Sequence, residues 1–195
     1  MGMLYYTPQI WCSDNTDAVD RIRIQYGTSF AYPLSTMGAH VSAVPNHQTG
    51  RVTDMKTRGV VAMTGAFGYE LDLGKLSEED KTAVREQIKT YHEAAPVILK
   101  GDYYRLSNPF EVEYGAWMSV DEEKKHAVVG AVLLNTHGNH PVFYIRLRGL
   151  APERSYRDKK TGAVYSGAAL MELGMPFTIV SGNYPSYQIL LDAVE

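Results

Sequence analysis

The pattern of the sequence changes near residue 100, and this change limits the possible folds more than any other feature. Before it, brief apolar runs alternate with helical patterns. After it, short runs rich in β-branched and aromatic residues are separated by Gly, Pro, Asn and charged turns. The first pattern is typical of α/β units and the second of an antiparallel β-sandwich. We therefore expect two parts, residues 1–101 and residues 102–195.

The first part contains two clear helical patterns. Apolar residues at helical spacing predict a helix from Asp17 to Tyr26. A longer helix should begin after Ser77, which forms a capping-box pattern with Asp80, and end near Pro96. Its apolar stripe is predicted to consist of Ala83, Val84, Ile88 and Tyr91.

Brief strands are expected within 39–44 and near 67–71. Strands that alternate with helices in this way indicate a piece of an α/β barrel. Only about two strand–helix units fit into the first part, whereas a complete barrel has eight.

Composition excludes several classes of protein. The net charge is -3 over 195 residues, so neither a nucleic-acid track nor a membrane-binding face is expected. There is no apolar run long enough to span a membrane. The single cysteine, Cys12, cannot form an internal disulfide, which favours a reducing compartment. A cytoplasmic protein is the expectation.

The stretch WCSDNTDAVDR, residues 11–21, places three aspartates around the start of the first predicted helix. Asp17 and Asp20 fall in its first turn, where negative charge is favourable; we expect Asp17 to cap the helix and Asp20 to be solvated. Asp14 follows an apolar run that is typical of a strand, so it should lie at a strand's carboxyl end, where barrel enzymes hold catalytic groups. From the residues alone, a cap or Asx-turn role for Asp14 is favoured over catalysis, because SDNT is turn-prone.

The motif SDNTDA, with RIQYGTS after it, resembles the late-barrel segment of bacterial α-galactosidases of glycoside hydrolase family 36. The resemblance continues through TRGVVAMTGAFGYELDL, GDYYRL and the last residues, and so covers essentially the whole chain. It implies the last part of a (β/α)8 TIM barrel followed by an antiparallel β-sandwich domain. The chain would correspond to the end of such an enzyme, starting inside the barrel at Gly2.

The resemblance also implies a role for Asp14. The family motif places the general acid/base of a retaining α-galactosidase at this position, for terminal α-galactosides of the raffinose and melibiose type. The family's nucleophile lies in a KWD motif, and no KWD occurs in this sequence. Because double displacement needs both carboxyl groups, the isolated chain is expected to be inactive. The alternative is a non-catalytic module for carbohydrate binding or subunit association.

Other residues around the motif have weaker assignments. Trp11 and Cys12 flank the acid and are candidates for substrate binding, although packing explains Trp11 equally well. His40 and His47 lie near the next strand end, where PNHQ either lines an outer part of the pocket or forms a structural loop. No metal and no cofactor are expected. Expected partners are an α-galactoside and either further copies of the chain or the missing barrel portion.

Overall fold

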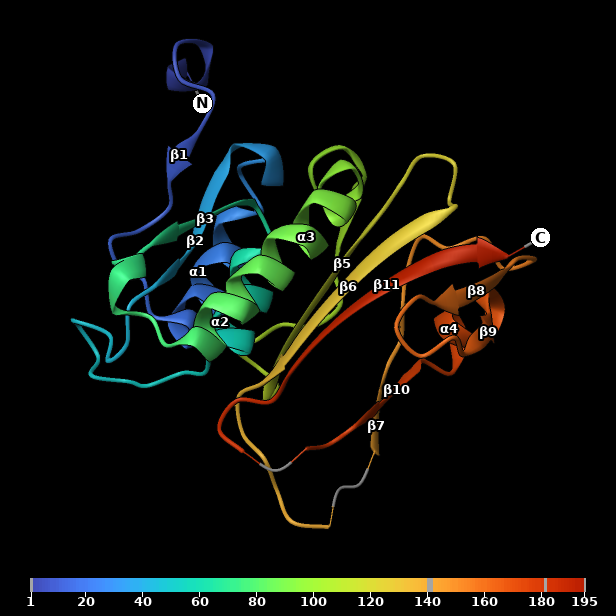
Figure 1. Cartoon of the computed structure of the whole chain (residues 1–195). Helices are drawn as coiled ribbons and strands as arrows, with labels where there is room; N and C mark the ends of the chain where they lie inside the picture. The colour runs from blue at the N-terminus through green and yellow to red at the C-terminus, as the bar shows by residue number, and fades with distance from the viewer. Residues whose placement is uncertain (1, 140–141, 181, 195) are drawn as a thin grey trace.

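The structure is a computed structural model that describes residues 2–139, 142–180 and 182–194 (Figure 1). The first part is built from three strand–helix units. The strands β1 (Ile10–Trp11), β2 (Met37–Ser42) and β3 (Ala66–Glu70) form a parallel sheet in that order. The helices that follow them are α1 (Ala18–Thr28), α2 (Met55–Ala62) and α3 (Glu78–Lys100). Our expectation of about two units was therefore too low, because β1 is only two residues long.

Short polar side chains set the starts of the helices. Asp17 caps α1 by accepting hydrogen bonds from the backbone of Val19 and Asp20. Ser77 caps α3 through the backbone of Asp80, as the capping-box pattern predicted. Single turns of 3-10 helix occupy Gly2–Tyr5, Leu34–Thr36 and Leu73–Lys75.

The long helix departs from the prediction at two places. It does not end near Pro96 but continues to Lys100, because Val97 and Ile98 are buried in a cluster with Leu34, Met37, Ala94 and Val128. Ile88 was placed on the buried stripe, yet its side chain is 39% exposed, and Gln87 is buried instead. Packing partners, which the periodicity of one helix does not reveal, decide both outcomes.

The second part is antiparallel. Its six-stranded sheet has the order β4-β5-β6-β11-β8-β9, and β7 pairs with β10 in a separate ribbon. The strands are β4 (Asp102–Arg105), β5 (Tyr114–Val120), β6 (His126–Leu133), β7 (Val142–Ile145), β8 (Ser155–Asp158), β9 (Val164–Ser166), β10 (Met175–Thr178) and β11 (Ser186–Val194). One short helix, α4 (Gly167–Glu172), follows β9. The core between the sheet and the ribbon includes Met118, Val129, Ile145, Phe177 and Leu191.

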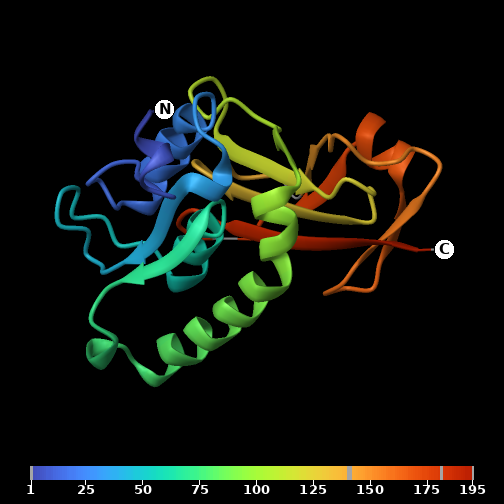
Figure 2. The same ribbon diagram turned by 90° about the horizontal axis from the view of Figure 1, so that it is seen from above.

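The helices of the first part pack on the sheet of the second part. Figures 1 and 2 show α3 lying between the parallel strands and the antiparallel sheet. Ile22 of α1 is buried with Val60, Val61 and Val132 of β6. The apolar face of α1 is therefore covered by α2 and β6. No helix among the described residues is long and apolar enough to cross a membrane.

Candidate active site

A cavity lies at the carboxyl ends of the three parallel strands. Its volume is about 300 Å³, and its walls come from the segments after β1 and β2 and from the end of β3. The lining residues are Trp11, Asp14, Thr16, Ser42, Ala43, Pro45, His47 and Glu70. The carboxyl edge of a parallel sheet is where α/β folds bind ligands, so this cavity is the candidate site.

Asp14 lies three residues beyond the end of β1 and is exposed. Its Oδ1 accepts a hydrogen bond from Trp11 Nε1 at 3.0 Å, and its backbone carbonyl accepts one from Gln48 Nε2 at 3.4 Å. Among the described residues, no donor bonds to Oδ2. The carboxyl group is thus held at one oxygen and free at the other, which suits an acid that must exchange a proton with a ligand.

The other two aspartates of the motif are engaged elsewhere. Asp17 is buried at the start of α1, forms an ion pair with Arg51 and accepts a hydrogen bond from Thr49 Oγ1 at 2.7 Å. Asp20 was expected to be solvated, but it accepts a hydrogen bond from Asn15 Nδ2 at 2.8 Å and lies 3.3 Å from Arg51 Nη1. Asp14 is the one member of the three that lines the cavity.

Trp11 and Cys12 lie in different environments in the structure. Trp11 lines the cavity, and its ring is stacked on the imidazole of His40 with centroids 4.2 Å apart. Cys12 packs instead against the hydrophobic cluster that contains Leu34 and Met37. Burial raises the pKa of the Cys12 thiol, and the nearby Arg21 partly opposes this effect.

The loop after β2 serves both of the roles that were left open for it. Asn46 is buried, and its Oδ1 accepts hydrogen bonds from the backbone of Gln48 and Thr49, which fixes the turn. Its amide donates to Thr16 Oγ1 at 3.2 Å, which connects this loop to the Asp14 loop. His47 projects from the same turn and lines the cavity.

Glu70 is a second carboxylate of the cavity and was not singled out from the sequence. Its Oε2 lies 2.9 Å from His40 Nε2. The side chain of His40 is only 8% exposed. Burial lowers the pKa of His40, Arg21 lowers it further, and Glu70 acts in the opposite direction. Only the register of β2 with β3 brings these two side chains together, and a spacing along the sequence does not reveal that register.

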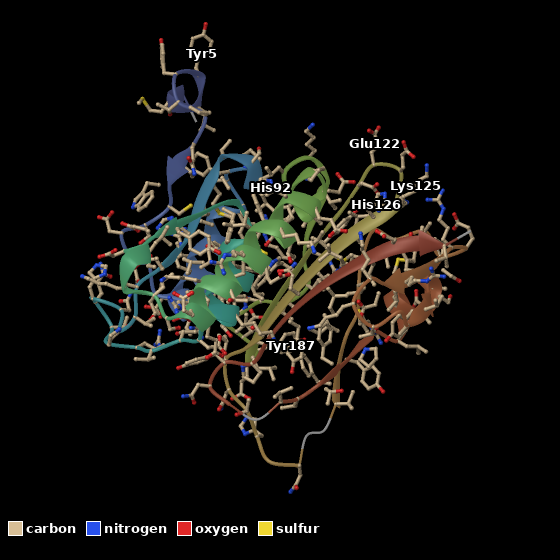
Figure 3. The ribbon with its side chains drawn as sticks, viewed as in Figure 1. Tyr5, His92, Glu122, Lys125, His126 and Tyr187 are labelled. Atoms are coloured by element: carbon tan, nitrogen blue, oxygen red, sulfur yellow. The ribbon has the colours of Figure 1, made fainter. Side chains whose placement is uncertain are left out.

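The tyrosines of the second part are mostly core residues. Tyr156 is fully buried, and Tyr187, labelled in Figure 3, packs against Phe143 and Phe177. A larger groove of about 950 Å³ runs between α3 and β11, and Asp14 is not among its lining residues. The contacts of Tyr156 and Tyr187 therefore indicate a role in the β-sandwich core rather than in a carbohydrate-binding surface.

This arrangement is that of a barrel hydrolase with a C-terminal β-sandwich. The strand–helix units form the last part of the barrel, and a carboxylic acid lies at the carboxyl edge of their strands. The chain belongs to glycosyl hydrolase family 36. Residues 1–101 match the Melibiase family, and residues 114–191 match the glycosyl hydrolase family 36 C-terminal domain. The expected family and the expected fold class, a barrel portion followed by a β-sandwich, are confirmed.

The relatives compared below are considerably longer than this chain. The bifunctional α-galactosidase/sucrose kinase AgaSK of Mediterraneibacter gnavus is 59% identical over 96% of this chain and 20% of its own length. The galactosidase domain of an α-galactosidase-sucrose kinase AgaSK superposes with a TM-score of 0.97 at 57% identity, over 99% of this chain and 27% of that one.

α-Galactosidase AgaA of Geobacillus stearothermophilus is 48% identical over 100% of this chain and 26% of its own length. A structure of an AgaA variant in complex with raffinose has a TM-score of 0.95 at 47% identity, over 99% of this chain and 27% of that one. The chain thus spans between a fifth and about a quarter of the length of these relatives.

Proposed function

We propose that the chain forms the C-terminal part of an α-galactosidase and supplies Asp14 as the general acid/base of a retaining mechanism. The substrates are terminal α-galactosides of the raffinose and melibiose type. The observation that carries this proposal is the position of Asp14, which lines the cavity at the carboxyl edge of the parallel strands with one carboxyl oxygen free. The structure of AgaA with raffinose supports the choice of substrate class.

In this mechanism Asp14 donates a proton to the glycosidic oxygen and later removes one from the attacking water. The partner carboxyl group must lie about 5 Å away, on the opposite side of the scissile bond. Glu70 does not fill this role in our proposal, because its carboxylate contacts His40. The nucleophile comes from the earlier barrel strands, which this chain does not include.

The remaining assignments follow from this proposal. Residues 1–101 form the end of the catalytic barrel and residues 102–195 form the C-terminal domain. Trp11 contributes an aromatic face to the substrate site, whereas we do not extend that role to Cys12, which packs in a core cluster. The chain associates with the missing barrel portion or with further copies of itself. The single cysteine supports a cytoplasmic location.

The test is an assay of the purified chain on an aryl α-galactoside, alone and mixed with a polypeptide that carries the earlier barrel strands of a relative. We expect no turnover by the chain alone, because acid assistance contributes about 10² to 10⁴-fold and whole enzymes begin near 10⁶-fold. Turnover should appear on mixing and be lost in Asp14→Asn. Robust turnover by the chain alone would overturn the proposal.

A further inference from the structure

Four side chains form a continuous line of contacts across the parallel sheet. Glu70 of β3 lies 2.9 Å from His40 of β2, and the ring of His40 is stacked on Trp11 of β1 at 4.2 Å and 14°. The Nε1 of Trp11 then donates to Asp14 Oδ1 at 3.0 Å. Each of the three strands thus contributes one member, and the line ends at the candidate acid.

The strand register explains why these side chains meet. Trp11 pairs directly with Gly38, and His40 pairs with Gly68. Residues two apart on a strand share one face of a sheet, so His40 lies on the same face as Gly38, and Glu70 on the same face as Gly68. The direct partners of Trp11 on β2 and of His40 on β3 are glycines, whereas Glu70 pairs directly with Ser42, so the contacts between the members run diagonally across the sheet.

The contact with Trp11 determines which oxygen of Asp14 can act as the acid. An N–H group directed at Oδ1 occupies that oxygen as an acceptor, so a proton on the carboxyl group belongs on Oδ2. A general acid must present the protonated oxygen to the leaving group within hydrogen-bond reach. The orientation of the indole therefore matters for the proposed reaction, and the stacked imidazole fixes that orientation.

We propose that His40 and Glu70 are positioning residues that act through Trp11 to orient the Asp14 carboxyl group. This inference rests on the acid/base role proposed for Asp14. Neither residue touches the reacting atoms in this scheme. His40 supplies a flat, largely buried ring behind the indole, and the Glu70 carboxylate lies 2.9 Å from its Nε2, close enough to restrict the ring although no hydrogen bond of good geometry joins them.

The stacked pair can be tested on the chain itself, which has only two tryptophans. Trp117→Phe leaves Trp11 as the single indole, and a protonated imidazole quenches the fluorescence of an indole stacked on it. Because burial and Arg21 lower the pKa of His40 more than Glu70 raises it, Trp11 emission should fall at a lower pH than expected for an unperturbed histidine. His40→Phe should keep the stacking and abolish the pH response.

His126 offers a matched control. It also pairs with a carboxylate, Asp192, at 2.8 Å, but it is exposed and lies on β6, far from β1 (Figure 3). His126→Phe should leave the fluorescence titration unchanged. An identical pH response in the Trp117→Phe chain and in its His40→Phe variant would overturn the proposed stacking role.

The effect on Asp14 is tested by the leaving-group dependence of kcat/KM in the enzyme completed with the earlier barrel strands. Acid assistance matters for an oligosaccharide but not for a dinitrophenyl galactoside, whose leaving group needs no proton. We expect His40→Phe and Glu70→Leu to lower kcat/KM on the oligosaccharide by up to about 10²-fold and to leave the activated substrate unaffected. Glu70→Gln should recover part of the loss, because the amide keeps a polar contact.

The two proposals fail in different ways. If Asp14→Asn lowers kcat/KM equally on both substrates or not at all, the acid role of Asp14 is wrong. If Asp14→Asn is selective for the oligosaccharide while His40→Phe and Glu70→Leu are not, the acid role stands and the positioning role is wrong.

Discussion

Asp17 and Arg51 form an ion pair that joins the loop after β1 to the loop after β2. The Asp17 side chain is only 1% exposed, and its Oδ1 also accepts the two backbone hydrogen bonds that cap α1. Arg51 in addition lies 3.3 Å from Asp20. The guanidinium group thus adds an ion pair to the hydrogen bonds that already join the two loops lining the candidate site.

Removal of that guanidinium group should destabilise the chain. We predict that Arg51→Met lowers the free energy of unfolding by about 2 kcal/mol, because it leaves a buried carboxylate without its charged donor. Urea unfolding followed by circular dichroism measures the change. Arg85→Met, at an exposed position on α3, is the control and should have little effect. Equal changes in both variants would show that the ion pair contributes nothing.

The thiol of Cys12 should react slowly with alkylating reagents. Burial raises its pKa above the ordinary thiol value. At a given pH, a smaller fraction of Cys12 is therefore thiolate in the folded chain than in the unfolded chain. The rate of reaction with iodoacetamide should therefore rise at higher pH in the folded chain than in the chain unfolded in urea. Since Cys12 is the single cysteine, the rates refer to one site. Superimposable pH profiles would contradict the prediction.

The features that could be predicted from the sequence are those set by neighbouring residues. Asp17 and Ser77 were recognised as caps because a cap acts within one turn of its helix. Asp14 was placed at a strand end from the apolar run before it. The turn-rich pattern after residue 100 indicated the β-sandwich, whereas the family resemblance was needed to identify the strand–helix units as the end of a complete barrel.

The features that were missed depend on contacts between distant elements. His40 and Glu70 lie 30 positions apart, and only the pairing of β2 with β3 brings them together. Gln87 is buried, and its Nε2 donates to Met55 O at 2.7 Å while its Oε1 accepts from Tyr69 at 2.7 Å. Helical periodicity predicted that Ile88 is buried at this part of α3. The periodicity of one helix gives no information about which residues of other elements pack against it.

Replacing the proline inside α3 should stabilise the chain. Pro96 lies within the helix and has no N–H group to bond to the carbonyl of His92. Proline costs about 3 kcal/mol relative to alanine inside a helix, and its rigidity in the unfolded chain offsets about 1 kcal/mol of that cost. Pro96→Ala should therefore raise the unfolding free energy by about 1 to 2 kcal/mol, whereas Pro152→Ala, outside any helix, should not. Destabilisation by Pro96→Ala would refute this expectation.

Gly59 and Gln87 provide a test in which one substitution should either stabilise or destabilise the chain, depending on the residue at the other position. A Cβ atom at Gly59 would lie 2.3 Å from Gln87 Nε2. Gln87 cannot move aside without losing its hydrogen bonds to Met55 and Tyr69. Alanine favours an α-helix over glycine by about 1 kcal/mol, but the loss of two buried hydrogen bonds costs about 1 to 3 kcal/mol for each group left unpaired.

We therefore expect Gly59→Ala to destabilise the chain although it improves the helix propensity of α2. In a Gln87→Ala background the clash is absent, so the same substitution should stabilise the chain by up to about 1 kcal/mol. Urea unfolding of the four proteins of this double-mutant cycle measures the coupling. A substitution at Gly59 with the same effect in both backgrounds would show that Gln87 does not require the glycine.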